Sequence, residues 1–214
     1  MNVAVDRYVD QTARWPKDGR HILAQFDAES IVVYQAYRPA IGHYAAEHGH
    51  FGGPEFGYGR MSWIKPNFLW MMYRCGWATK ENQEVVLAVR IRRDGFDEIL
   101  RQAVPSTFVA ALFESESAWQ ESLRTSNVRL QWDPDHEPHG GRLLRRAIQL
   151  GLRGEVLKSY CGPWIVSIED ISDFVRAQHA VLTEQGLGAL MTPNEEVYPV
   201  RDPQVRTRLG MALP

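Results

Sequence analysis

The residues best suited to chemistry gather between Gly59 and Trp77, in the segment GRMSWIKPNFLWMMYRCGW. Three cations, Arg60, Lys65 and Arg74, stand here among tryptophans and methionines. Aromatic faces stack on planar rings, and guanidinium or ammonium groups pair with phosphate or carboxylate. We therefore predict that the segment folds as a strand, a turn and a helix that line a pocket, with Arg60 and Lys65 facing a substrate.

Core packing is the alternative for this segment, because tryptophan and methionine at helical spacing usually fill gaps in a protein interior. We expect core packing for the helical part, Phe68–Met72. The corner formed by residues 62–65 fits either interpretation, since a cation beside an apolar run needs a partner.

Arg38 is a second candidate, at the end of the apolar run Ile31–Tyr37. The alternation of a strand puts its guanidinium on the same face as Tyr34, at the rim of the sheet. A planar bidentate donor beside tyrosines suits a pyrophosphate or a carboxylate. An ion pair with a nearby acid is the structural alternative.

Polar side chains also alternate along two late strands. Arg129, Gln131 and Asp133 share one face of the run VRLQWDP. They form either a polar wall of a site or the solvent side of an edge strand. In the run RRAIQLGL, Gln149 lies opposite the apolar face, so it must meet water, another residue or a ligand.

The charge balance limits the partners of the protein. The 214 residues carry 24 Lys and Arg against 26 Asp and Glu, a formal net charge of −2. This excludes a generally basic nucleic-acid binder but not a local basic groove. The stretch from Arg142 to Arg153, which includes Arg146, is the most basic of the chain and predicts either an anion-binding patch or a solvated surface.

Several standard signatures are absent from the sequence. There is no Gly-rich dinucleotide fingerprint, P-loop, nucleophile elbow or HExxH motif. His136 and His139 have the spacing of a metal site but lack a third ligand nearby, so we predict no metal. Cys75 follows bulky apolar residues, which predicts burial rather than nucleophilic reactivity.

Composition predicts a soluble, cytoplasmic protein with no membrane partner. The chain is 44% hydrophobic and has two cysteines, too few for a disulfide framework. Its N-terminus carries acids where a signal peptide needs cations. The longest apolar stretch, Phe68–Tyr73, is far shorter than a membrane span.

Strands and helices intersperse along the chain and must bring these candidates together. Residues 31–37, 85–91, 128–133, 147–152 and 164–168 read as strands. Helices are predicted from Pro39, over 68–76, around 96–104 and over 173–185. We predict an α+β fold with curved, mainly antiparallel sheets and flanking helices, forming a single domain over residues 1–214, with 187–214 as a surface-wrapping tail.

The chain resembles a family of small bacterial and fungal proteins known as domain of unknown function 4291. The shared stretches are VVYQAYRPAI, RMSWIKPNFLWMMYRCGW, VRLQWDP and RRAIQLGL followed by WIVSIEDIS. They run in the same order and cover nearly the full length. The family name carries no activity.

The order of elements is also similar to that of the ADP-ribosyltransferases, which bind NAD in a cleft between two small antiparallel sheets. This resemblance implies a split two-sheet architecture, with Arg38 holding the dinucleotide and Ser62 and Trp63 at the end of a second strand. Gln149 occupies the place of the catalytic glutamate. A neutral carboxamide cannot stabilise an oxocarbenium-like centre as a carboxylate would, but it can bond a ribose hydroxyl.

We therefore expect an ADP-ribosyltransferase-like enzyme with NAD as co-substrate and an unknown acceptor, a nucleic acid or a small molecule. Arg38, Ser62 and Gln149 would act in catalysis. The residues expected to bind the cofactor are Arg38, Ser62, Tyr34, Trp63 and Tyr73, and those expected to bind substrate are Arg60, Lys65, Gln131, Asp133 and Arg146.

Two alternatives stay open. The first is a non-enzymatic module that binds a nucleotide or single-stranded nucleic acid through the arginines and exposed aromatics. The second is hydrolysis or transfer on another small molecule, with Asp133 as the acid.

Overall fold

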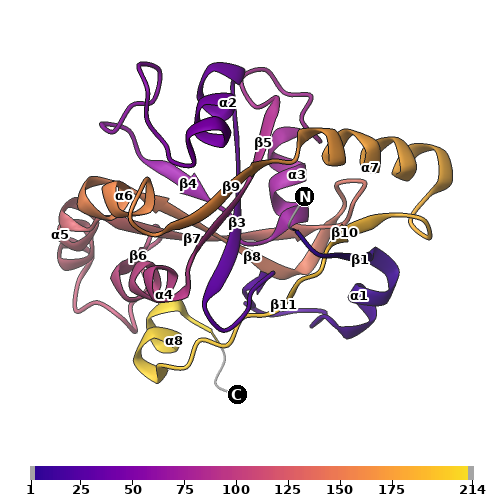
Figure 1. Cartoon of the computed structure of the whole chain (residues 1–214). Coiled ribbons are helices and arrows are strands. Elements are labelled where there is room, and N and C mark those ends of the chain that lie inside the picture. Colours follow the sequence, from indigo (N-terminus) through magenta and orange to yellow (C-terminus); the bar gives the residue numbers. More distant parts are fainter. Residues whose placement is uncertain (1–2, 212–214) are drawn as a thin grey trace.

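The computed structural model describes residues 3–211, which form eight helices and eleven strands (Figure 1). Two sheets make up the centre. The first is antiparallel, in the order β3 (Ser30–Tyr37), β5 (Val85–Arg92), β9 (Ile165–Asp170). The second has the order β4 (Ser62–Ile64), β8 (Arg142–Leu152), β7 (Val128–His136), β6 (Ala103–Pro105), and its β6–β7 pair is parallel.

The two sheets meet where β3 passes the end of β4. Tyr34 and Lys65 exchange backbone hydrogen bonds there, with N···O distances of 2.7 and 3.2 Å. We call this pair the seam. Because it fixes the backbone of Lys65, it also determines how β4 leads into the next helix.

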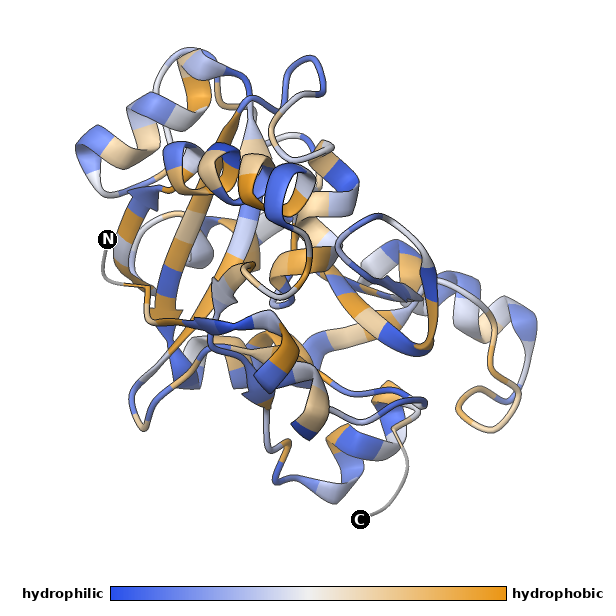
Figure 2. Ribbon diagram, turned by 90° about the vertical axis from the view of Figure 1, so that its right-hand side faces the viewer, coloured by the Kyte–Doolittle hydropathy of each residue, from blue (hydrophilic) through white to orange (hydrophobic). Residues whose placement is uncertain are grey.

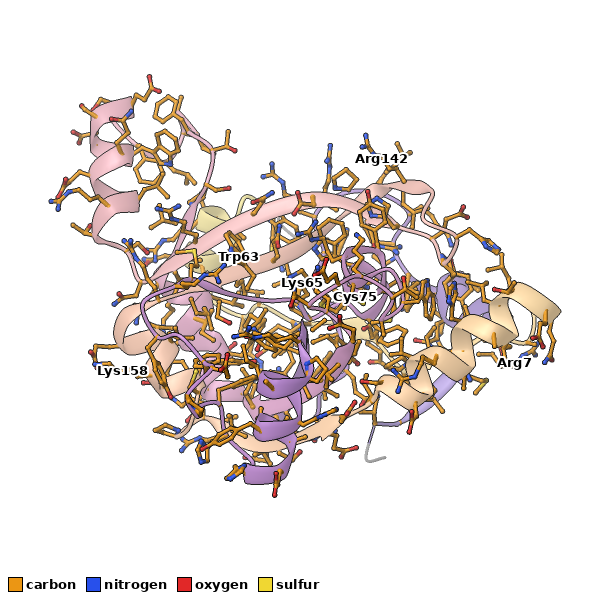
Figure 3. All side chains as sticks on the ribbon, turned by 90° about the horizontal axis from the view of Figure 1, so that it is seen from above. Arg7, Trp63, Lys65, Cys75, Arg142 and Lys158 are labelled. Carbon is orange, nitrogen blue, oxygen red and sulfur yellow. The ribbon has the colours of Figure 1, made fainter. Side chains whose placement is uncertain are left out.

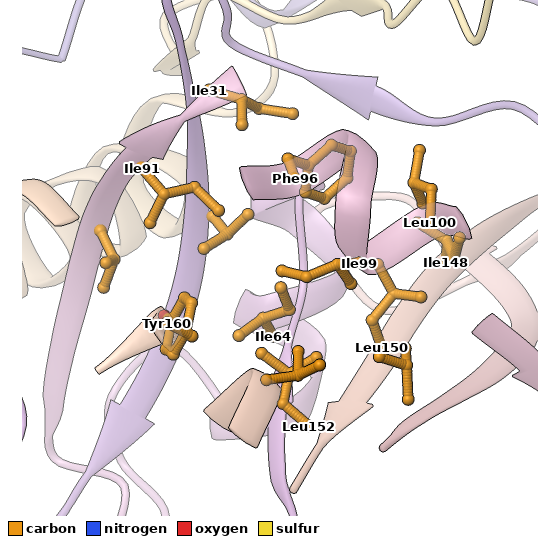
Figure 4. Packing of buried hydrophobic residues seen from close by; sticks show 14 of the residues in the cluster. Ile31, Ile64, Ile91, Phe96, Ile99, Leu100, Ile148, Leu150, Leu152 and Tyr160 are labelled. Atoms are coloured by element: carbon orange, nitrogen blue, oxygen red, sulfur yellow. The ribbon is translucent and has the colours of Figure 1, made fainter. Parts of the chain in front are cut away.

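The apolar run of β3 is buried on both faces, as its lack of alternation predicts. Ile31 and Val33 belong to the core between the two sheets, with Ile64 of β4 and Leu150 of β8 (Figure 4). Val32 and Tyr34 point the opposite way, into a second apolar cluster under α3 (Phe68–Cys75) and α7 (Ser172–Gln185). β3 is therefore the strand around which both cores are built.

Several helices cover the sheets with one apolar face, and Figure 2 shows hydrophilic and hydrophobic segments alternating along them. α4 (Arg93–Gln102) buries Phe96, Ile99 and Leu100, the stripe that its spacing predicts. α3 begins at the Asn67 cap, whose side chain accepts from the Trp70 N–H at 2.7 Å. The remaining helices are α1 (Tyr8–Arg14), α2 (Pro39–His48), α5 (Glu116–Thr125), α6 (Gly154–Tyr160) and α8 (Pro203–Leu209).

Helix α2 approaches the sheet closely at Gly42. A Cβ atom at this position would lie 2.4 Å from Cγ1 of Val85, the first residue of β5. Such contacts essentially do not occur between real atoms, so a side chain here would push the helix away from the sheet.

The C-terminal segment runs across the molecule and also enters its interior. β10 (Met191–Pro193) pairs with β1 (Val5–Arg7), and β11 (Glu196–Val197) pairs with β2 (Leu23–Ala24). Tyr198 is fully buried in the main core. The buried Glu195 carboxylate accepts from Asn67 Nδ2 at 3.0 Å and from the Phe68 N–H at 2.6 Å, so the C-terminal segment helps to cap α3.

The mixed fold with antiparallel sheets is as predicted, and so are the long elements. The strand predicted over residues 128–133 is longer in the structure, because β7 continues to His136 and pairs there with Arg142. The short helices α1, α5, α6 and α8 were not predicted. None of the helices formed by residues 3–211 combines the length and apolar character needed to cross a membrane.

Candidate functional site

A cavity of about 660 Å³ opens beside the seam, a volume typical of small-molecule sites. Its walls come from six parts of the chain: the end of β3, the first turn of α2, the loop before β4, β4 itself, α3 and the turn before β5. The lining residues include Gln35, Tyr37, Arg38, Glu55, Phe56, Arg60, Met61, Ser62, Trp63, Lys65, Met71 and Arg74.

A hydrogen-bonded chain lies along one wall of the cavity. The Tyr160 hydroxyl donates to Gln35 Oε1 at 2.7 Å, and Gln35 Nε2 donates to Ser62 Oγ at 2.8 Å. The hydroxyls of Tyr37 and Ser62 are 2.7 Å apart. Burial raises the pKa of Tyr37, so its phenol stays protonated. Ser62 is therefore fixed by neutral partners, and none of these is a base that would activate it as a nucleophile.

Four cations line the cavity, and their partners differ. Arg38 forms an ion pair with Glu55, which within residues 3–211 is the one carboxylate lining the cavity. Arg60 and Arg74 are exposed, and no acidic side chain of the described residues lies within ion-pair distance of either. The cavity therefore presents a surplus of positive charge to a ligand.

Lys65 is the buried member of this group, with 5% of its surface exposed. Burial lowers the pKa of its amine to about 8, and the nearby Arg74 guanidinium acts in the same direction. Asp133 and Cys75 oppose the shift. Lys65 lines the cavity, and no acceptor among the described residues lies within hydrogen-bond distance of its Nζ.

A row of polar side chains lies beside the cavity on the outer face of the second sheet. Gln149 Nε2 donates to Asp133 Oδ2 at 2.7 Å, and Gln131 Nε2 donates to Asp133 Oδ1 at 2.8 Å. Ile64 pairs with Leu150 in antiparallel register, so Lys65 and Gln149 lie opposite each other. Their side chains therefore point to the same face of the sheet. Neither Gln149 nor Asp133 is among the cavity's lining residues.

The side chain of Trp63, which belongs to β4, lies over Gly151 of β8 and next to this row of polar side chains. A Cβ atom at its partner Gly151 would be 3.0 Å from Trp63 Cε2 and 2.5 Å from Met61 Sδ. The glycine therefore leaves the room in which both side chains lie against the sheet. Trp63 is half-buried and keeps part of its ring toward the cavity.

Gln131, Asp133 and Gln149 thus lie beside the cavity without lining it, and three more of the residues expected in the site lie elsewhere. Tyr34 is fully buried in the second apolar cluster, so no ligand reaches it. Tyr73 stacks on His136 with ring centroids 3.5 Å apart and does not line the cavity. Arg146 is exposed on β8, where its backbone N–H donates to Gly19 O at 2.8 Å.

The basic stretch 142–153 does not form one patch. Arg145 is buried, with its Nη2 2.6 Å from Asp135 Oδ2. Arg153 donates to the backbone carbonyls of Ser126, at 2.8 Å, and Leu123, at 3.1 Å. These guanidiniums serve the fold, which removes much of the charge that a nucleic-acid groove would need.

Sequence reasoning missed Gln35, Tyr37, Tyr160 and Glu55. A signal was available for Gln35, since a lone carboxamide within the apolar run IVVYQAY must find hydrogen-bond partners once buried. Glu55 lies in an irregular loop and Tyr160 on a short helix, and neither segment has a pattern that points to this cavity. Among residues 3–211 no group of three metal-ligating side chains occurs.

Comparison with known proteins identifies the family. The family model described as domain of unknown function (DUF4291) matches residues 21–198, most of the chain, and the protein therefore belongs to this family. A search of curated proteins found no match.

Proposed function

We propose that the protein is an ADP-ribosyltransferase-like enzyme, which binds NAD in the cavity beside the seam and transfers ADP-ribose to a nucleic-acid or small-molecule acceptor. The observation that carries the proposal is the place and charge of this cavity. It lies where two small, mainly antiparallel sheets meet, as the resemblance to ADP-ribosyltransferases implies.

The surplus of cations supports a ligand with phosphate groups. Arg60 and Arg74 have no internal acid to neutralise them, and guanidinium groups bind phosphate oxygens in a bidentate manner. Arg38 can join them by exchanging its Glu55 carboxylate for the pyrophosphate. The half-buried ring of Trp63 offers a face for the nicotinamide.

The proposed transfer breaks the bond between the anomeric carbon of the ribose and the nicotinamide nitrogen, which leaves with the electron pair. The acceptor then bonds to that carbon and releases a proton. Gln149 cannot supply negative charge, but Asp133 lies one strand further on and holds its amide at 2.7 Å. Asp133 and Gln149 lie beside the cavity and not among its lining residues, so the proposed transfer requires the ribose to extend past the cavity wall to this pair. There the carboxylate supports the positive charge that develops, because an anion close to such a centre stabilises it.

Binding without chemistry is the second candidate. The observation in its favour is that Glu55, the carboxylate of the cavity, is already paired with Arg38. In this case the protein binds a nucleotide or single-stranded nucleic acid and leaves it intact.

Calorimetric titration with NAD tests the proposal, followed by an assay for released nicotinamide. We expect Arg74→Gln to weaken NAD binding about tenfold, the loss of one charge-assisted contact. Arg124→Gln is the matched control, because Arg124 is an exposed arginine on α5, away from the cavity. No heat at millimolar NAD removes the proposal. Binding without nicotinamide release, or affinity for single strands that falls steeply with salt, selects the second candidate.

A further inference from the structure

The side chain of Lys65 combines three features that no other lysine of the chain shares. It is buried, it lines the cavity, and its amine has no hydrogen-bond acceptor among the described residues. Figure 3 shows Lys65 in the middle of the molecule between Trp63 and Cys75, and Lys158 at its periphery. The three other lysines, Lys17, Lys80 and Lys158, are bonded to backbone carbonyls or to a carboxylate.

The backbone around Lys65 explains why the amine stays in this place. The seam holds its N–H and C=O against Tyr34, and Pro66 and the Asn67 cap follow directly. The backbone of Lys65 is therefore fixed from both sides, and its side chain starts from a buried position beside the cavity. Arg74 and Cys75 of α3 and Asp133 of β7 act electrostatically on its amine, and the exposed Arg74 lines the same cavity.

We propose that Lys65 is a nucleophilic amine that forms an imine with a phosphate-bearing aldehyde bound in the cavity. The neighbouring arginines Arg60 and Arg74 bind the phosphate, and the half-buried Trp63 covers the carbon skeleton. The inference goes beyond the proposed function, because it does not require that NAD binds.

The step balances without an oxidant or reductant. The lone pair of Nζ attacks the carbonyl carbon, and a C–N bond forms while the carbonyl π bond breaks. The two hydrogens of the neutral amine leave with the carbonyl oxygen as water, and a C=N bond remains. Only an unprotonated amine has the required lone pair, and a desolvated lysine beside another cation is the known way to supply it.

The burial and the neighbouring cation set the size of the expected effect. With its pKa at about 8, Lys65 is largely protonated at pH 7.5 but has about 100-fold more free amine than an ordinary lysine. The other lysines of the chain serve as internal controls, since all four amines meet the same reagent in the same tube.

The experiment treats the whole protein with pyridoxal 5′-phosphate at pH 7.5, reduces the imine with borohydride and measures the label on each lysine by peptide mass spectrometry. Pyridoxal, which lacks the phosphate, is the matched reagent. We expect label on Lys65 to exceed that on Lys17, Lys80 and Lys158 at least about tenfold with the phosphorylated aldehyde. The preference for the phosphorylated reagent should fall at least about threefold in Arg74→Gln.

Two results overturn the inference. One is equal labelling of the four lysines, and the other is labelling of Lys65 that does not depend on the phosphate. Neither depends on NAD, so a failed NAD titration with selective labelling of Lys65 rejects the proposed function alone. NAD binding without selective labelling of Lys65 rejects the imine proposal alone. The wild-type protein carries the main measurement, so the outcome does not rest on the folding of a variant.

Discussion

Replacing Lys65 with methionine is expected to stabilise the protein at pH 7 and to stabilise it much less at pH 10. Methionine keeps the length of the side chain and removes the charge. The pKa of the Lys65 amine is lowered from 10.5 to about 8 in the folded protein. Between these two values the unfolded chain binds more protons than the folded chain, so the free energy of unfolding rises with pH across this window.

The size of the effect follows from the shift. Below about pH 8 the whole cost of burying the charged amine is present, and above 10.5 it is gone. Each unit of pKa shift corresponds to about 1.4 kcal/mol. The free energy of unfolding of Lys65→Met should therefore exceed that of the wild type by about 2–3 kcal/mol more at pH 7 than at pH 10. Packing differences between lysine and methionine are the same at both pH values and cancel in this comparison.

Urea unfolding of both proteins at pH 7 and pH 10 measures the difference. Lys158→Met is the control, because Lys158 is exposed and paired with Glu155, so the substitution should change stability by less than about 1 kcal/mol at either pH. An equal stability difference between wild type and Lys65→Met at both pH values refutes the argument. It would mean that the buried amine keeps an ordinary pKa.

Three further predictions concern contacts that form the fold and the cavity wall. Ser62→Ala leaves the two side chains bonded to it without that partner, and unfolding should cost about 1–2 kcal/mol less in calorimetry. Gly42→Ala should lower the free energy of unfolding by about 1–3 kcal/mol, because its methyl group would meet Val85. Adding Val85→Ala to this variant should recover part of the loss. A double variant whose loss equals the sum of the two single losses would contradict the close contact. Asp135→Asn leaves Arg145 as a buried charge without its counterion, and a loss of about 3–5 kcal/mol is expected in denaturant unfolding, whereas a loss below about 1 kcal/mol would show that solvent reaches the pair.

The sequence predicts the long elements of this fold because each shows its burial directly. β3 is an unbroken apolar run that lies between two cores, and α4 has a clear apolar stripe. α5 buries none of its residues fully, and only Trp119, Ser122 and Leu123 are half-buried, so its inward face is weakly marked in the sequence. α6 and α8 have seven residues each, too few for a periodic pattern to stand out.

The candidate site was predictable only in part, because strand alternation shows which residues share a face but not what covers that face or which strand lies beside it. Alternation places Tyr34 and Arg38 on one face of β3, but α3 covers that face and only the end of the strand reaches the cavity. Alternation likewise gives Gln149 a polar face. That its partner is Asp133 follows from the register between β7 and β8, which a single sequence does not specify.

The cap of α3 has a consequence for the way the chain is made. Glu195 bonds the first turn of a helix that begins at Phe68, more than a hundred positions earlier. During synthesis that carboxylate is still absent when the helix leaves the ribosome, and β1 and β2 also wait for partners in the last part of the chain. We expect the wall of the cavity to reach its final form only after residues 191–197 have left the ribosome, so a nascent chain arrested before this point should expose α3 to protease.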